Sequence, residues 1–177
     1  MNYFEFYTIP ESFYPDEKTV KAKFYENSRK FHPDFHAGAA PEKQREILEL
    51  STLNTNAYKT LSNFESRLHY ILEQHGLVGE GTKNELPQAF LLDMMDLNER
   101  LMDLEFDFDP EAVAGLQTEF DTVWGNLEAE GQPLLESYAE LTEAEKTQAL
   151  EHIKIYYLKR KYLLRIKETL STFANRS

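Results

Sequence analysis

The sequence predicts an all-α protein made of two helical units joined by a short linker. Apolar residues recur at spacings of three and four along most of the chain, which is the period of a helix, and no segment shows the alternation of a half-buried strand. The 177 residues, 41% of them hydrophobic, can bury a core without disulfides, and the chain contains no cysteine. We expect the units at residues 1–76 and 88–177, and the linker at residues 77–87.

The first unit begins with an apolar stretch at residues 3–7, followed by loop residues and a helix from Asp16 to Phe31. Asp16 is a suitable N-cap. Pro33 ends the helix because proline lacks an amide hydrogen and disfavours helical geometry at the residue before it. One face of this helix, predicted to point into a core, carries Val20, Phe24, Asn27 and Phe31.

Two further helices are predicted in the first unit, at about residues 42–61 and 64–75. A short loop places the 42–61 helix antiparallel to the preceding one, and Gly76 is a natural residue to follow the end of the 64–75 helix. The stripe of the longer helix consists of Ile47, Leu50, Asn54, Ala57, Tyr58 and Leu61, and that of the shorter one of Leu68, Ile71, Leu72 and His75.

Asparagine stands in the middle of two of these stripes, at positions 27 and 54. Buried amides need hydrogen-bond partners. Because the antiparallel arrangement brings Asn27 closer to the start of the longer helix than to Asn54, we expect local backbone or water partners for both. We also expect a first unit of reduced stability, which replacement of Asn27 by Leu should raise.

The second unit is predicted to be a three-helix bundle. Its helices run from about residue 88 to 105, from about 110 to 127, and from Thr142 towards the C-terminus. Continuation of the middle helix past a kink at Gly131 and Pro133 is left open. Thr142 and Glu145 have the spacing of a capping box, in which the two side chains satisfy backbone amides at the start of a helix.

The helix at residues 88–105 carries more apolar surface than one core contact needs. The stripe predicted to face the bundle consists of Phe90, Met94, Leu97, Leu101 and Leu104, and a second stripe on another face consists of Leu91, Met95 and Met102, with Leu92 near the charged edge. The second stripe is either also buried or an exposed surface for a protein partner. The eight carboxylates between Asp93 and Glu111 are either a solvated face or a means of attracting a basic partner.

The net charge of −12 is concentrated in the second unit. Residues 1–76 contain nine Lys or Arg and eleven Asp or Glu, whereas residues 77–177 contain ten and twenty. So acidic a chain repels phosphate backbones, and nucleic-acid binding is not expected. No membrane association is expected either, because no apolar run approaches the about 20 residues of a membrane-spanning helix. The N-terminus has acidic residues before its first Lys, unlike a targeting peptide, which favours the bacterial cytoplasm.

No catalytic, cofactor or metal site is predicted. The sequence has no nucleophile-elbow, P-loop or dinucleotide-binding motif, and without cysteine it has no thiolate. His32 and His36 have the spacing of a helical metal pair, but Pro33 interrupts the helix that would align them. An enzyme in which His32 and Asp34 act as acid and base is an alternative that no substrate-pocket signature supports.

The turn between the first two long helices carries the tripeptide His32, Pro33 and Asp34. A helix C-terminus favours a protonated His, Pro fixes the turn, and the Asp carboxylate can accept two hydrogen bonds from a partner's Arg. The outward face of the preceding helix is partly basic and carries Lys18, Lys21 and Arg29. These features predict a protein-docking tip, although turn chemistry alone also produces such a tripeptide.

An amphipathic helix ending in Phe31, the His-Pro-Asp tripeptide, a loop and a longer helix containing AYKTL together resemble a J-domain, from residue 3 to about 75. The resemblance implies that this unit stimulates ATP hydrolysis by a chaperone of the DnaK type. The chaperone-binding residues that it implies are His32, Pro33, Asp34, Lys21, Arg29 and Lys30. Generic J-domains usually carry basic residues where this chain has Tyr25, Glu26 and Phe35, which implies a specialised partner chaperone.

The whole chain is similar to the HscB family of co-chaperones, on the segments YF, HPDF, STLNTNAYKTL, SRLHYILEQHG and AFLLDMMDLNERL. The resemblance implies an L-shaped molecule, monomer favoured, without catalysis of its own, that brings an IscU-type iron-sulfur cluster scaffold to an HscA or DnaK-type ATPase. The scaffold-binding residues that it implies are Leu91, Leu92, Met95, Asp96, Glu99 and, least directly, Tyr157. The alternative is a J-domain protein whose acidic helical unit binds unrelated protein cargo.

Overall fold

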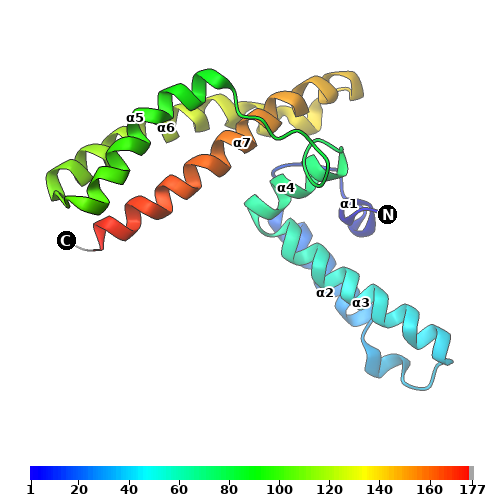
Figure 1. Ribbon diagram of the computed structural model, residues 1–177. Helices are drawn as coiled ribbons and strands as arrows, with labels where there is room; N and C mark the ends of the chain where they lie inside the picture. The colour runs from blue at the N-terminus through cyan, green and yellow to red at the C-terminus, as the bar shows by residue number, and fades with distance from the viewer. Residues whose placement is uncertain (176–177) are drawn as a thin grey trace. The chain divides into compact units, whose positions relative to one another are not determined.

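The computed structural model describes residues 1–175, and this part of the chain contains α-helices, two short 3-10 helices and loops but no strand. The prediction of an all-α protein is confirmed. The chain forms two compact units (Figure 1). The first comprises Met1–Leu77 together with the 3-10 segment Tyr138–Glu140, and the second comprises Val78–Ser137 and the chain from Leu141 onward.

The first unit opens with a short helix, α1 (Tyr3–Tyr7), where the sequence predicted only an apolar stretch. Asn2 and Glu5 form a capping box at its start, and its inward face buries Phe4 and Tyr7. Five residues are too few for a helical period to be visible in the sequence. The capping-box spacing of Asn2 and Glu5 was the one available signal.

Helices α2 (Glu17–Lys30) and α3 (Pro41–Leu61) lie side by side and antiparallel (Figure 1). The Asp16 carboxylate caps α2 by accepting a hydrogen bond of 2.9 Å from the amide of Thr19, and hydrogen bonds from Thr19 lower the pKa of this carboxyl. In the contact between the helices, the rings of Phe24 and Tyr58 stack at a centroid distance of 4.3 Å. The predicted bounds and core-facing stripes of both helices agree with the structure.

Asn54 is buried in this contact, and its amide bonds across it rather than locally. Its Nδ2 donates to the backbone oxygen of Phe24 and to Oγ of Ser28, each at 3.0 Å. The expectation of local backbone or water partners is therefore wrong for Asn54, because α2 approaches closely enough to supply both acceptors. Asn27 is only half-buried. Among the described residues, Asn54 Oδ1 is a buried oxygen without a hydrogen-bond partner.

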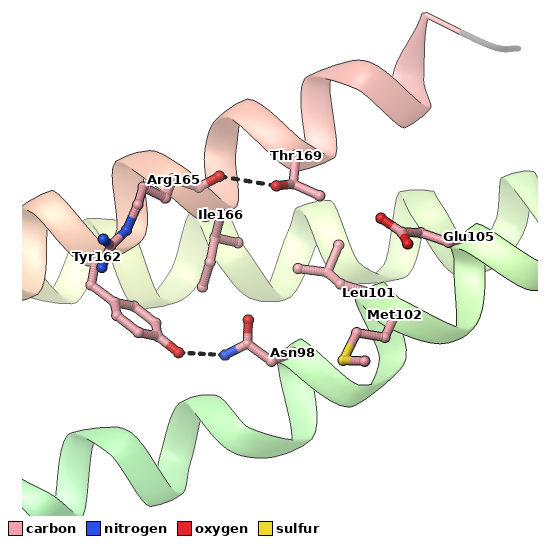
Figure 2. Close-up of a pocket in the computed structure, with 8 residues that line it drawn as sticks. All are labelled: Asn98, Leu101, Met102, Glu105, Tyr162, Arg165, Ile166 and Thr169. Atoms are coloured by element: carbon pink, nitrogen blue, oxygen red, sulfur yellow. Dashed lines mark hydrogen bonds between the residues drawn. The ribbon is translucent and has the colours of Figure 1, made fainter.

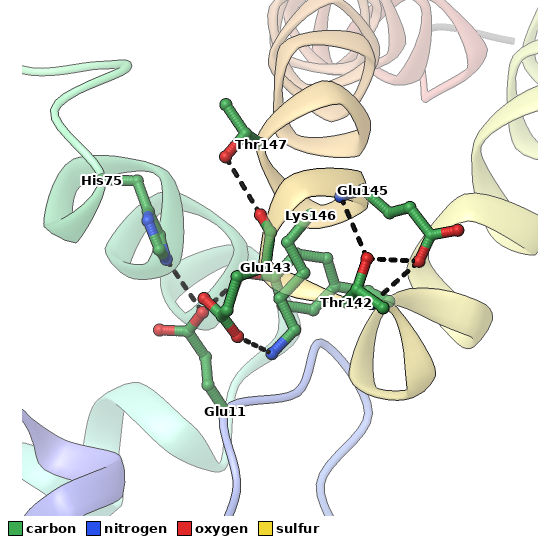
Figure 3. A network of polar contacts seen from close by, with 8 residues as sticks. Glu11, His75, Thr142, Glu143, Glu145, Lys146 and Thr147 are labelled. Atoms are coloured by element: carbon green, nitrogen blue, oxygen red, sulfur yellow. Dashed lines mark hydrogen bonds and ion pairs between the residues drawn. The ribbon is translucent and has the colours of Figure 1, made fainter.

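Helix α4 (Phe64–Gln74) completes the first unit and ends, as predicted, before Gly76, whose φ of 68° suits glycine. Its buried face includes Arg67, whose Nε donates to the Phe13 backbone oxygen at 2.8 Å and whose guanidinium also donates to the Leu61 backbone oxygen at 2.5 Å. His75 was expected in the apolar stripe, but it is the exposed C-cap residue and bonds Glu11 at 2.9 Å (Figure 3).

The second unit is a bundle of three helices, α5 (Gln88–Phe106), α6 (Pro110–Ser137) and α7 (Glu143–Ala174). Helix α6 runs through both Gly131 and Pro133 as one element. Gly131 is buried against α7, and a Cβ atom at this position would lie 2.2 Å from the ring of Tyr156. The absence of a side chain at Gly131 therefore lets α6 and α7 pack closely.

The start of α7 is the capping box predicted from Thr142 and Glu145 (Figure 3). The Glu145 carboxylate accepts from the Thr142 hydroxyl at 2.7 Å and from the Thr142 amide at 2.9 Å, and these two hydrogen bonds lower the pKa of the Glu145 carboxyl. An ion pair between Lys146 and Glu143, at 2.9 Å, adds to the first turn. Throughout residues 1–175, no helix is both long and apolar enough to cross a membrane.

Candidate functional site

The tripeptide His32, Pro33 and Asp34 lies on the loop that joins α2 to α3. Pro33 opens a 3-10 helix, Pro33–His36, for which His32 is the N-cap residue. Proline suits this position because its missing amide hydrogen has no role at the start of a helix. His32 Nδ1 accepts the Asp34 amide at 3.3 Å. All three side chains are exposed.

The residues around the tripeptide anchor the loop to both helices. Phe31, directly before it, is buried and its ring lies 6.2 Å from that of Phe6. His36 Nε2 bonds the Lys30 backbone oxygen at 2.9 Å, and the Gln44 amide on α3 donates to two loop carbonyls, those of residues 37 and 39, at 3.0 and 2.9 Å. His36 and Gln44 thus position the tip. The sequence singled out His36 only as half of a metal pair that was set aside, and Gln44 not at all, because their partners are backbone atoms of a folded loop.

The tip exposes the Asp34 carboxylate, a hydrogen-bond acceptor, and the imidazole ring of His32 to a partner protein. The Asp34 side chain is 88% exposed, and its Oδ2 lies 3.9 Å from His32 Nδ1. Because Nδ1 accepts the Asp34 amide, the neutral imidazole carries its proton on Nε2. Phe35, whose ring lies 5.5 Å from that of His32, is exposed as well. The arrangement can form charge-assisted hydrogen bonds to a cationic side chain.

The three basic residues expected to complete this site are all exposed but are not all close to the tripeptide. Arg29 and Lys30 lie in the last turn of α2. Lys30 Nζ is 5.2 Å from the ring of Phe31. Lys21 lies eight residues before Arg29, a distance of about 12 Å along the helix axis. The site therefore consists of the tripeptide with Arg29 and Lys30 in the adjoining turn of α2, whereas Lys21 lies farther along the helix.

The second site is the outward face of α5, and the structure decides between its two interpretations. Met94, Leu97, Leu101 and Leu104 are buried, as the first stripe predicts, and Phe90 is half-buried. The second stripe is exposed to the following extents: Leu91 42%, Leu92 60%, Met95 57% and Met102 62%. This face is a solvent-exposed apolar surface rather than a second core contact.

Carboxylates border this apolar surface. Asp96 and Glu99 are exposed, and Asp96 pairs with Arg100 at 2.7 Å. Arg100 also donates to Glu119 on α6 at 2.6 Å, and this hydrogen bond is the main reason that the pKa of its guanidinium is raised. Since Arg100 is the only Lys or Arg of α5, the face is acidic with its one cation already paired.

Tyr157 is not part of this surface. It was included as a residue of α7, but it is only 8% exposed and packs within the bundle. Phe106, by contrast, is 88% exposed at the end of α5 and was not singled out in the sequence. The described residues hold no cluster of three or more side chains suited to a metal ion.

Known proteins resemble this chain in sequence. A family model described as the HSCB C-terminal oligomerisation domain matches residues 86–171. A co-chaperone protein HscB homolog of Vibrio atlanticus is 31% identical over 86% of this chain and 91% of its own length. A Vibrio vulnificus protein of the same description is 27% identical over 96% of this chain and 95% of its own length.

Solved structures resemble this chain in fold. The chaperone HscB from Vibrio cholerae matches 96% of this chain and 99% of its own, with a TM-score of 0.59 and 25% identity. The crystal structure of human co-chaperone protein HscB matches 97% of this chain and 81% of its own, with a TM-score of 0.65 and 24% identity, a likeness of fold. Since the Vibrio atlanticus similarity extends over most of both proteins, the chain belongs to the HscB family of co-chaperones.

Proposed function

We propose that this co-chaperone stimulates the ATPase of an HscA or DnaK-type chaperone and delivers an IscU-type iron-sulfur cluster scaffold to it. Two exposed surfaces of different chemistry support the proposal. One is the polar tip at residues 32–34, and the other is the apolar face of α5. A delivery protein needs two such surfaces because it must hold its cargo and contact the receiving chaperone at the same time.

The observation that carries the proposal is the exposure of the tripeptide on an anchored loop. The Asp34 carboxylate is open to a partner's Arg, which would bind it in a two-pronged geometry. Arg29 and Lys30, one turn away, suit an acidic patch on the chaperone and would speed the encounter. Because the loop is already held by His36 and Gln44, docking costs little ordering entropy.

The α5 face supports the cargo role. Leu and Met side chains are adaptable apolar contacts, and the carboxylates beside them favour a partner with a basic rim. Holding the scaffold on this face while the tip engages the chaperone makes the second binding event intramolecular. The scaffold is thereby concentrated at the chaperone. The chain itself supplies no catalytic step in this mechanism.

The test is the ATPase rate of an HscA-type chaperone with this protein present or absent, each with and without an IscU-type scaffold. We expect the two proteins together to accelerate hydrolysis by more than the sum of their separate effects. Asp34→Asn, which keeps the shape of the side chain, should return the rate to its unstimulated level. Leu92→Ala/Met95→Ala should keep the stimulation by this protein alone and lose the additional effect of the scaffold.

The matched control is Glu49→Gln, an equally conservative change of an exposed carboxylate on α3, which should behave like the wild type. Full stimulation by Asp34→Asn would overturn the assignment of the tip. An unchanged scaffold effect in Leu92→Ala/Met95→Ala would overturn the assignment of α5. If the scaffold adds nothing even to the wild-type protein, the acidic unit serves other cargo.

A further inference from the structure

The exposed apolar surface of α5 continues past the residues assigned to the scaffold. Met102 follows Met95 by seven positions and Phe106 follows Met102 by four, so the three side chains lie on one face of the helix. Met102 is 62% and Phe106 88% exposed. From Leu91 to Phe106 the face extends for about 22 Å, at about 1.5 Å per residue. Large side chains so exposed and so aligned indicate a protein contact.

A groove between α5 and α7 lies beside the second half of this face (Figure 2). Its volume is about 470 Å³, and its lining includes Leu101 and Met102 from α5 and Ile166 from α7. The polar groups at one end are already paired, because the Asn98 amide donates to the hydroxyl of Tyr162 and to the Met94 backbone oxygen. Glu105, Arg165 and Thr169 also line the groove, and its apolar part between Met102 and Ile166 is suited to an apolar side chain.

Charge identifies the kind of partner. The carboxylates of Asp103, Glu105 and Asp107 are exposed along the same half of α5. The one cation of the helix, Arg100, is paired with Asp96 and Glu119. A second copy that docked its own α5 here would bring like charges together, which is unfavourable. A partner that presents an apolar ridge with basic residues on its flanks fits this half of the helix.

We infer that the scaffold contact extends over Met102 and Phe106, with an aliphatic or aromatic side chain of the scaffold seated in the α5–α7 groove between Met102 and Ile166. This inference rests on the proposed function, because it assigns the same partner to a longer surface. It adds two contact residues and one side-chain pocket to the interface. It also specifies that the scaffold surface is apolar, basic at its edges and about 22 Å long.

The test is calorimetric titration of an IscU-type scaffold into the full-length protein and its variants. Met102→Gln and Phe106→Gln remove apolar surface while keeping a helix-favouring, uncharged residue. We expect each to weaken scaffold binding by about three- to tenfold, and the double variant by more than tenfold. Leu48→Gln, at a similarly exposed leucine on α3 of the first unit, is the control and should leave the affinity unchanged.

A parallel titration of Leu92→Ala/Met95→Ala separates the inference from the function on which it rests. If that variant loses affinity and Met102→Gln/Phe106→Gln does not, the longer interface is overturned while the scaffold role stands. If neither variant loses affinity, the scaffold role fails as well. Light scattering of the wild type and of Met102→Gln/Phe106→Gln tests a second copy as the occupant. A dimer that only the glutamine variant dissociates, with scaffold affinity unchanged, would also overturn the inference.

Discussion

The helices of the two units are held together by different kinds of interaction. The first contains both of the buried polar or charged residues among residues 1–175, Asn54 and Arg67, and each bonds backbone of another segment. The second unit has an apolar interior in which Gly131 lets α6 and α7 approach closely. Its cross-helix polar contacts, such as that between Arg160 and Glu128, lie at the partly exposed edge.

The difference corresponds to what each unit presents. Directed hydrogen bonds have a narrow geometry, so they fix the arrangement of α2, α3 and the loops around them and hold a polar tip in one conformation. Apolar packing needs only complementary shape. A small bundle held in this way can leave α5 half covered, with one face buried and the other free for a partner. The comparison predicts that the two units respond to different substitutions.

The largest effect is expected for Arg67→Met in the first unit. The substitution keeps an apolar stem but removes the donors to the carbonyls of Phe13 and Leu61. Hydrogen bonds to charged groups contribute about 1.5–3 kcal/mol each, so we expect the loss of both to lower the free energy of unfolding by roughly 3–6 kcal/mol. Trp124 is the only tryptophan and lies on α6. Its fluorescence therefore reports the second unit, whereas far-ultraviolet circular dichroism reports both.

In urea titrations, Arg67→Met should make the transition followed by circular dichroism begin at lower urea. The transition followed by Trp124 fluorescence should stay where it is in the wild type. Arg45→Met, at an exposed arginine of α3, is the control and should change neither. If the Trp124 transition moves together with the circular dichroism transition, the two units unfold as one. The claim that they respond to different substitutions would then be wrong.

Most helix boundaries could be predicted because they depend on local chemistry. Pro33, Gly76 and the Thr142 capping box act within a few residues of themselves, and the structure has helix ends at all three. The partners of Asn54 and Arg67 could not be predicted in this way. They are atoms on other segments, and their distances depend on how closely the helices pack.

The candidate sites were predictable to different degrees for the same reason. His32 to Asp34 lie in a turn, and turns are exposed as a rule. The second stripe of α5 was ambiguous because its burial depends on how many helices surround α5, which no single helix specifies. Phe106 lay beyond the predicted end of that helix, at residue 105, and Tyr157 was assigned by motif without knowledge of its burial.

A smaller effect, now in the second unit, is expected for Gly131→Ala. A Cβ atom there would lie 2.2–2.8 Å from the ring of Tyr156, including Cγ at its base, so the ring or the helix must shift. Overpacking of this kind costs about 1–3 kcal/mol, while alanine gains about 1 kcal/mol of helix propensity over glycine. We expect a net loss of up to roughly 2 kcal/mol, detected as an earlier Trp124 transition in urea.

Gly125→Ala, on the same helix, is the matched control for Gly131→Ala. Nothing lies within 4 Å of its added methyl group, so only the gain in helix propensity remains and the Trp124 transition should move to higher urea. Equal stabilisation by both alanines would show that α6 and α7 are not held by close approach at Gly131. The second unit would then not depend on close packing of its helices, and this part of the contrast between the units would be wrong.

The smallest effect is expected for Asn27→Leu in the first unit. Asn27 lies on the inward stripe of α2 but is only half-buried, so leucine gains helix propensity and part of its burial, together roughly 0.5 kcal/mol. Asn56→Leu, exposed on α3, gains propensity alone and should stabilise less. The measurement is the melting temperature by circular dichroism. A fall for Asn27→Leu would show that this amide is hydrogen-bonded to partners, as the Nδ2 of Asn54 is to α2. Hydrogen bonding would then contribute to the first unit even at its half-exposed edge.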